Sequence, residues 1–380
     1  MNKQFIYALS TLTGTIIGVG LFSLPYIASE VGLATMIFYF LFFGLVVVTI
    51  SLMYGEITLR TSKTCRLAGY AGHYLGHWGK RVILFSDGFG LYGACLAYLI
   101  IGGGFISSIF ESAGINLGFD GTLLFFGLGA FLVYFGVKGI AKAELFSLIL
   151  FFVVLGLLTL KGLPHIDLTN LLNFESNQFF LPYGPVLFSL GGLALIPEVK
   201  EILKDRPKDL KKVVATAILI ALFTYLTFII LVTGMTGSQT TNDAITGLSL
   251  IFDNGVIFLA LCFGFLTTFT SYITISLTMK KIMMYDFSVQ KGLAWFLACF
   301  VPLFLFYLGL DNFIEIIGLS GGVMMGIDIA IIIAIYLKAK RKGDMEPAYQ
   351  MNLPKIIIYF LLALFLMGVF YQIFYFLSGL

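Results

Sequence analysis

The sequence is poor in charged residues. Only 11% of its 380 residues are charged, 59% are hydrophobic, and the mean hydropathy is +1.00. A chain of this composition has too little polar surface to cover a soluble globule, so a soluble protein is excluded and an integral membrane protein is predicted. No polar domain stands at either end, which predicts a single membrane domain over residues 1–380.

Cysteines and catalytic motifs are also scarce. The four cysteines form no CxxC pair, so we expect no disulfide framework. The sequence contains no HExxH motif and no grouping of serine, histidine and aspartate, so we expect neither an enzyme nor a cofactor beyond a coupling ion. No small-residue cleavage site follows the first apolar run, which is therefore expected to stay in the protein.

Eleven apolar runs are long enough to cross roughly 30 Å of hydrocarbon. They cover residues 5–28, 33–55, 82–110, 121–139, 143–163, 179–199, 213–234, 254–279, 292–309, 312–337 and 355–378. If the N-terminus is cytoplasmic, 22 of the 23 lysines and arginines fall in cytoplasmic segments, and only Lys161 lies outside. The positive-inside rule therefore predicts an eleven-helix, multi-pass protein of the cell membrane with a cytoplasmic N-terminus and an extracellular C-terminus. The net charge of +3 then reflects topology in the lipid bilayer and indicates no nucleic acid partner.

The first run contains GTIIGVGLFSLP, residues 14–25, in which three glycines and a proline weaken a membrane helix. Each interior glycine costs about 1 kcal/mol relative to alanine. Pro25 removes a further hydrogen bond, because it has no N–H to donate to the Leu21 carbonyl. The helix is therefore expected to break near Gly18 and Gly20.

A second copy of this pattern lies in the sixth run. Gly20-Leu-Phe-Ser-Leu-Pro25 aligns with Gly192-Leu-Ala-Leu-Ile-Pro197 at an offset of 172 residues, so the two copies cross the membrane in opposite directions. This predicts a five-plus-five inverted repeat with broken helices one and six, covering about 5–163 and 179–337, and an extra helix at about 355–378. Close helix packing is the alternative use of membrane glycines. We expect that use for Gly102, Gly103, Gly104, Gly321, Gly322 and Gly326.

These motifs resemble a known group of proteins. GTIIGVGLFSLP resembles the first-helix signature of the amino acid–polyamine–organocation superfamily. Two further runs are similar to its amino acid/auxin permease and aromatic amino acid permease branches: Leu195-Ile-Pro-Glu-Val-Lys-Glu-Ile-Leu, continuing into LKDRPKDLKK, and Ala97-Tyr-Leu-Ile-Ile-Gly. The resemblance implies the fold of the sodium-coupled leucine transporters and alternating-access transport of an amino acid.

The resemblance also implies a substrate site at the two breaks. The substrate carboxylate would bind the N–H groups of Val19 and Gly20, and its amino group would meet carbonyls near Ile16 and around Phe188 and Ser189. A half-helix N-terminus does offer free donors and partial positive charge to an anion, and unwound carbonyls suit a cation. The implied substrate-binding set is Ile16, Gly18, Val19, Gly20, Tyr98, Phe188, Ser189 and Gly191.

The residues expected to select the substrate side chain are all uncharged, which favours a neutral amino acid, aliphatic or aromatic. They are Tyr92, Tyr98, Phe188, Ser189, Thr268 and Met324. For Tyr98 a packing role is an equal alternative.

The eighth run carries a line of hydroxyl groups. Thr267, Ser271, Thr274 and Thr278 fall at i, i+4, i+7 and i+11, which predicts one hydroxyl-lined helix face. Bonds to the helix's own carbonyls are the simpler explanation for each hydroxyl alone. The Thr270-Ser271 pair resembles the hydroxyl pair of sodium-coupled relatives, and this implies a sodium site. Its ligands would be the carbonyls of Gly14, Ile17 and Thr267 and the hydroxyls of Thr270 and Ser271, all neutral oxygens that suit a hard cation.

Proton coupling is the rival interpretation. Some proton-driven members of the superfamily place a lysine at the cation position, but here the only lysine of the fifth run is Lys161, at its outer end. Asp87 and Asp328 are intramembrane carboxylates and are therefore candidate proton carriers, with a buried hydrogen bond as the alternative role. Near the cytoplasmic helix ends, Glu56 is expected to pair with Arg60 and Glu198 with Lys200 and its neighbours.

The sequence thus predicts a secondary active transporter that imports a neutral amino acid, coupled to sodium or alternatively to protons. A channel or a non-transporting sensor is less favoured. Nothing in the sequence resembles a filter loop, a ring of charges or a soluble output domain.

Overall fold

The computed structural model describes residues 3–63, 65–115, 118, 120–136, 140–172, 178–252, 254–285 and 287–378, and their regular structure is helical throughout. The α-helices are α1 (Lys3–Ile16), α2 (Gly20–Val31), α3 (Leu33–Arg60), α4 (Leu67–Leu75), α5 (His77–Ser112), α6 (Gly121–Phe135), α7 (Ile140–Gly162), α8 (Tyr183–Ser189), α9 (Ile196–Ile202), α10 (Asp209–Thr236), α11 (Asn254–Tyr285), α12 (Lys291–Tyr307), α13 (Phe313–Leu319), α14 (Met325–Lys342) and α15 (Lys355–Ser378). A π-helical turn, η7 (Ser320–Met324), joins α13 to α14. The 3-10 helices are η1 (Leu163–His165), η2 (Leu168–Leu171), η4 (Leu193–Leu195), η5 (Gly237–Gln239) and η6 (Thr246–Leu250).

Length and hydropathy mark this as a multi-pass membrane fold. Among the described residues, seven helices are long and apolar enough to span a bilayer, and the bent pair of α1 and α2 makes an eighth. The helices α6 and α12 are apolar but shorter. The prediction of an all-α integral membrane protein is therefore confirmed, whereas the count of eleven spans stays a prediction.

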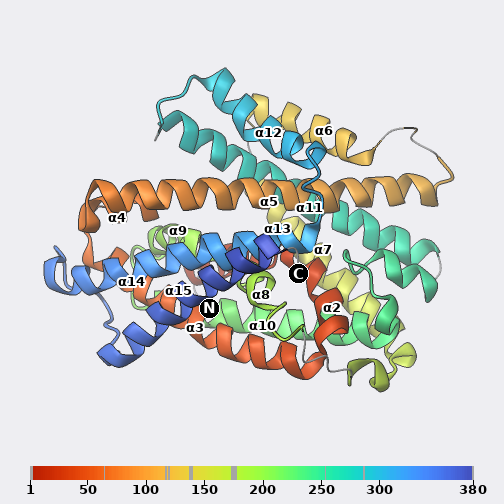
Figure 1. Cartoon of the computed structure of the whole chain (residues 1–380), viewed down its shortest axis with the longest axis horizontal. Helices are drawn as coiled ribbons and strands as arrows, with labels where there is room; N and C mark the ends of the chain where they lie inside the picture. Colours follow the sequence, from red (N-terminus) through yellow and green to blue (C-terminus); the bar gives the residue numbers. More distant parts are fainter. Residues whose placement is uncertain are drawn as a thin grey trace.

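The long helix α5 organises the bundle. Figure 1 shows α5 running across the whole molecule, with α6 and α12 on one side and α3, α10 and α14 on the other. The helix α11 packs along α5, while α10 packs against α1, α2 and α3. Aromatic rings fill the interior: Phe22, Phe105 and Phe125 are fully buried, and the rings of Phe22 and Phe105 meet edge to face.

The first helix breaks within GTIIGVGLFSLP, as the sequence predicts. The helix α1 ends at Ile16, α2 begins at Gly20, and the two axes are bent by 51°. Across the break, the Gly18 N–H donates to Ile16 O and the Leu21 N–H donates to Gly18 O. These donors miss their α-helical partners four residues back, which are the carbonyls of Gly14 and Ile17.

The sixth run breaks as well. The helix α8 ends at Ser189, Gly192 has a non-helical backbone (φ −136°, ψ 3°), and α9 begins at Ile196 after the 3-10 turn. Pro197 has no N–H to donate to the Leu193 carbonyl, which instead accepts from the Ile196 N–H. A 3-10 turn brings a donor one residue nearer and satisfies the carbonyl that proline cannot reach.

Most of the other membrane glycines serve helix packing. A Cβ on Gly102 or Gly103 would clash with Phe125 or Thr122 of α6, and one on Gly321 would clash with the backbone of Gly184. Gly322 and Gly326 pack in the same way against Gln372 and Val369 of α15. For Gly104 the packing expectation is wrong, because a Cβ there would meet nothing within 4 Å. The four cysteines are free thiols, as expected.

Candidate functional site

Both helix breaks open into one cavity of about 510 Å³. This volume lies within the usual range for small-molecule sites. The cavity brings together all members of the substrate-binding set, the sodium-ligand set and the proton-carrier pair expected from the sequence. Its lining includes Gly14, Ile16, Ile17, Gly18, Val19, Gly20, Asp87, Tyr98, Phe188, Ser189, Gly191, Thr267, Thr270, Ser271 and Asp328.

The two breaks touch each other through glycine. A Cβ on Gly20 would clash with the Ser189 side chain and would lie 2.9 Å from the Ser189 Cα. A Cβ on Gly192 would lie 2.7 Å from Cγ1 of Ile16. Only glycine permits such an approach, so the motif glycines bring the two unwound segments into contact.

The first break leaves both N–H donors and carbonyl acceptors of the backbone without hydrogen-bond partners from across the break. Among the hydrogen bonds of the described residues, none is donated by the N–H of Val19 or Gly20, and none from across the break reaches the carbonyls of Gly14 or Ile17. Val19 itself is fully buried, so its N–H lacks bulk water as a partner. Free N–H groups at the start of α2 favour an anion, and free carbonyls near the end of α1 favour a cation.

The carbonyls expected to meet a substrate amino group are largely occupied. Ile16 O accepts from the Gly18 N–H at 2.9 Å and from the Tyr225 hydroxyl at 2.6 Å. Phe188 O accepts from the Gly191 N–H at 3.0 Å. A carbonyl oxygen has two lone pairs, so Ile16 O is filled and Phe188 O keeps one of its two.

The carbonyl oxygen of Ser189 can still accept one more hydrogen bond. It accepts from the Tyr225 hydroxyl at 2.7 Å, which uses one of its two lone pairs. Sequence reasoning missed Tyr225, because it lies on α10, outside both broken helices. Its hydroxyl bridges the two breaks.

The predicted hydroxyl face of α11 faces the cavity. Thr267, Ser271, Thr274 and Thr278 all line it. Thr270 donates to the carbonyls of Leu266 and Thr267 of its own helix, both at 3.1 Å. A hydroxyl that donates its proton in this way keeps its lone pairs for a cation. Oγ1 of Thr267 is buried and makes no hydrogen bond within the described part of the chain.

Four of the expected selectivity residues line the cavity: Tyr98, Phe188, Ser189 and Met324. The Tyr98 hydroxyl lies over the first break, 3.0 Å from where a Cβ on Gly18 would be. Two others do not line it. Tyr92 donates to Leu297 O of α12 at 3.2 Å, and Thr268 is fully buried with its hydroxyl on Gly264 O. Both expectations are wrong: the Tyr92 side chain is turned toward α12, and the Thr268 hydroxyl is bonded to the backbone of its own helix, α11.

The two intramembrane aspartates meet. The side chain of Asp328 on α14 contacts both Asp87 and Ser86 of α5, and the Ser86 hydroxyl donates to Met324 O at 2.8 Å. Oδ1 of Asp328 is buried without a hydrogen-bond partner among the described residues. Eleven residues separate Asp87 from Tyr98, so the pair lies about 16 Å along α5 from the level of the breaks.

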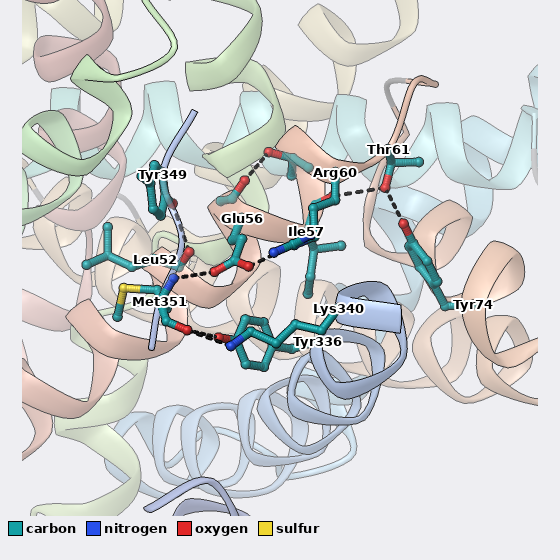
Figure 2. Close-up of polar contacts among 12 residues, drawn as sticks. Leu52, Glu56, Ile57, Arg60, Thr61, Tyr74, Tyr336, Lys340, Tyr349 and Met351 are labelled. Carbon is teal, nitrogen blue, oxygen red and sulfur yellow. Dashed lines mark hydrogen bonds and ion pairs between the residues drawn. The ribbon is translucent and has the colours of Figure 1, made fainter. Parts of the chain in front are cut away.

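A polar cluster lies at the end of the bundle where α3 and α14 end. We call this end of the bundle the basic end, after Arg60 and Lys340. Figure 2 shows the buried Glu56 carboxylate accepting from Arg60 Nε at 2.8 Å and from the Met351 N–H at 2.5 Å. The Tyr349 hydroxyl donates to Leu52 O at 2.8 Å. The expected pairing of Glu56 with Arg60 is confirmed, and the same carboxylate holds the segment after α14 against α3.

The expected pairing of Glu198 with Lys200 is wrong. Glu198 instead lies 3.8 Å from Arg66, and Lys200 donates to the carbonyls of Thr58 at 2.5 Å and Thr61 at 3.5 Å. The last carbonyls of a helix have no intrahelical partner, and a lysine there satisfies them. Lys200 therefore joins α9 to the end of α3.

The chain as a whole is similar to known proteins. The crystal structure of MhsT in complex with L-phenylalanine is similar over 100% of this chain and 99% of that one, with a TM-score of 0.66 and 14% identity, so the two share a fold. Glutamine transporter 2 of Aliivibrio fischeri is 22% identical over 363 residues, which cover 91% of this chain and 92% of that protein. The resemblance to amino acid transporters is thus confirmed, while the superfamily branch stays a prediction. Residues 1–374 match the model of one family, and the chain therefore belongs to the tryptophan/tyrosine permease family.

Proposed function

We propose that this protein is a secondary active transporter that imports a neutral amino acid by alternating access. The observation that carries the proposal is the contact of two broken helices at one cavity, where Gly20 packs on Ser189. The free N–H groups of Val19 and Gly20 suit the substrate carboxylate, and the remaining lone pair of Ser189 O suits its amino group.

The substrate is a neutral amino acid with an aliphatic or aromatic side chain. Tyr98 and Phe188 at the breaks, and Met324 elsewhere in the cavity lining, carry no charge that would pair with a basic or acidic side chain. Membership of the tryptophan/tyrosine permease family supports an aromatic substrate. The glutamine transporter and the MhsT complex with L-phenylalanine support a neutral one more broadly.

Sodium drives the transport in this proposal. Gly14 and Ile17, whose carbonyls are released by the break, line the same cavity as Thr267, Thr270 and Ser271. Neutral oxygens are the ligands that a hard monovalent cation prefers. One half of this set comes from α1 and the break that follows it, and the other half from α11, so closure of the cavity between them would complete the ion's coordination.

Proton coupling is the second candidate, favoured by the contact between Asp87 and Asp328. Two carboxylates in contact inside a membrane protein cannot both be charged at low cost, so the pair would hold one shared proton. Tyr54 of α3 is an ionisable group on a neighbouring helix that lies close enough to interact with both aspartates. In this version the shared proton is the coupling ion.

The wider architecture follows the same proposal. One membrane domain of eleven spans, arranged as a five-plus-five inverted repeat with a final added helix, would place the N-terminus in the cytoplasm and the C-terminus outside. The basic end would then face the cytoplasm of a cell whose plasma membrane holds the protein. Fusion of a reporter to each terminus tests this orientation.

The experiment that tests the function uses purified protein and all twenty amino acids, with and without sodium. A ligand that binds only the folded state raises its melting temperature. We expect neutral amino acids to stabilise the protein, more strongly with sodium, and the best ligand to accumulate in proteoliposomes only with an ion gradient. Non-saturating passive flux would contradict transport and favour a channel. A response to pH and not to sodium would favour the aspartate pair.

A further inference from the structure

Tyr225 occupies the junction of the two helix breaks. It lies on α10, its side chain is fully buried, and its hydroxyl is 2.6 Å from Ile16 O and 2.7 Å from Ser189 O. Ile16 is the last residue of α1, and Ser189 is the last residue of α8. The Tyr225 hydroxyl oxygen therefore contacts the last residue of α1 and the last residue of α8, the first half of each broken helix.

The hydroxyl has one proton for these two acceptors. The proton is shared between the carbonyls or alternates between them, and in either case it holds both oxygens to one point. Carbonyls at the end of a helix have lost their intrahelical donors, and a buried carbonyl without a donor is costly. Tyr225 supplies the donor that the breaks remove from the backbone.

The rest of α10 holds Tyr225 in place. The Thr233 hydroxyl, two turns further along, donates to Pro25 O of α2 at 2.9 Å. The ring of Tyr225 packs against the ring of Phe40 from α3, with centroids 5.8 Å apart. The helix is thus fixed to both sides of the first break, and the hydroxyl cannot follow a carbonyl that moves away.

We propose that Tyr225 is a positioning residue for the amino end of the substrate. By tying Ile16 O to Ser189 O, it aims the free lone pair of Ser189 O into the cavity and keeps it at a fixed distance from the N–H groups of Val19 and Gly20. A substrate ammonium and carboxylate then meet partners whose separation is already set, so less ordering is needed on binding. This inference rests on the function proposed above.

Tyr225→Phe tests the inference, because it removes one oxygen and keeps the ring. Thr227→Val is the matched control: it lies on the same helix, and its hydroxyl donates to Phe223 O of α10 itself. Two measurements apply. The first is amide hydrogen exchange of the ligand-free protein. The second is binding of L-tryptophan and of its analogue without the amino group, indole-3-propionate, followed by thermal shift and by inhibition of uptake.

In the phenylalanine variant we expect faster exchange at residues 16–20 and 189–193, and weaker L-tryptophan binding by about tenfold, the effect of one lost hydrogen bond. Indole-3-propionate should lose less than twofold, because it has no amino group to position. The control should match the wild type in every measurement. A merely structural role for Tyr225 would weaken both ligands equally.

Three outcomes would overturn the inference. Unchanged exchange at the two breaks would show that Tyr225 does not tie them, and this result does not depend on any ligand. Tighter L-tryptophan binding by the variant would show that the hydroxyl competes with the amino group. Equal losses for both ligands would remove the link to the amino end. Failure of the wild-type protein to bind any amino acid would instead contradict the proposed function.

Discussion

Gly20 and Ser189 lie so close together that a single added methyl group on Gly20 would overlap the Ser189 side chain. The two residues belong to helices separated by most of the first half of the chain. Their contact makes the first break one wall of the cavity and the second break another. The missing side chain at position 20 is therefore part of the site.

Gly20→Ala should separate the two breaks and abolish substrate binding. The added Cβ meets the Ser189 backbone as well as its hydroxyl, so a side-chain rotation cannot relieve the clash. Overpacking of this kind costs about 1–3 kcal/mol in stability. Loss of the substrate-induced thermal shift in folded protein is the measurement.

Gly104→Ala is the control for that variant. A Cβ at Gly104 meets nothing within 4 Å, and the residue lies inside helix α5, where alanine is the better helix former. We expect an unchanged thermal shift and unchanged uptake. Equal behaviour of the two alanine variants would mean that the contact between Gly20 and Ser189 has no part in binding.

The helix breaks could be predicted because their cause is local. Glycine and proline weaken a helix wherever they stand, so GTIIGVGLFSLP located the first break within a residue or two, and its second copy located the other. The contact between the breaks could be anticipated only through the resemblance. Tyr225 could not be found at all, since nothing distinguishes one of 19 tyrosines from its neighbours until α10 is packed against α1 and α8.

The rotation of each helix was the weakest part of the prediction. The hydroxyl line of α11 was identified because several residues share one face, whereas the single positions Tyr92 and Thr268 were assigned to the wrong faces. A membrane helix that is apolar all round gives little sign of which face turns inward. The π-helical turn at Ser320–Met324 could not be predicted from the sequence either. It accompanies the close backbone approach of Gly321 to Gly184, which is a tertiary contact.

Thr270→Val and Ser271→Ala should weaken the dependence on sodium. Each removes one proposed oxygen ligand and little volume, so we expect at least a tenfold rise in the sodium concentration for half-maximal uptake, with binding restored at saturating sodium. Thr159→Val on α7 is the control, because its hydroxyl donates to Leu155 O of its own helix. Sodium titrations identical to wild type in both variants would rule out this site.

Asp87→Asn and Asp328→Asn separate the two coupling hypotheses. If the pair carries the coupling proton, wild-type uptake should fall as rising pH ionises both carboxylates, and each asparagine variant should lose gradient-driven accumulation but keep substrate binding. If sodium is the coupling ion, both variants should still accumulate substrate under a sodium gradient. Uptake followed from pH 5.5 to 8.5, with each gradient applied alone, distinguishes these results.

Glu56→Gln should lower the stability of the protein through the basic end. The carboxylate is fully buried, and it holds Arg60 and the Met351 N–H together (Figure 2). Glutamine keeps the shape but removes the charge and replaces one acceptor oxygen with an NH₂ donor, so either the largely buried Arg60 or the Met351 N–H loses its acceptor, which costs about 2 kcal/mol or more. The exposed Arg66, 3.8 Å from Glu198, provides the contrast: Arg66→Gln should cost less than about 1 kcal/mol. Thermal unfolding of both variants in the same detergent measures the difference.

Equal melting temperatures would mean that the Glu56 cluster contributes no more than a surface ion pair. The segment after α14 would then be held by the hydrogen bonds of Tyr336, Lys340 and Tyr349 alone.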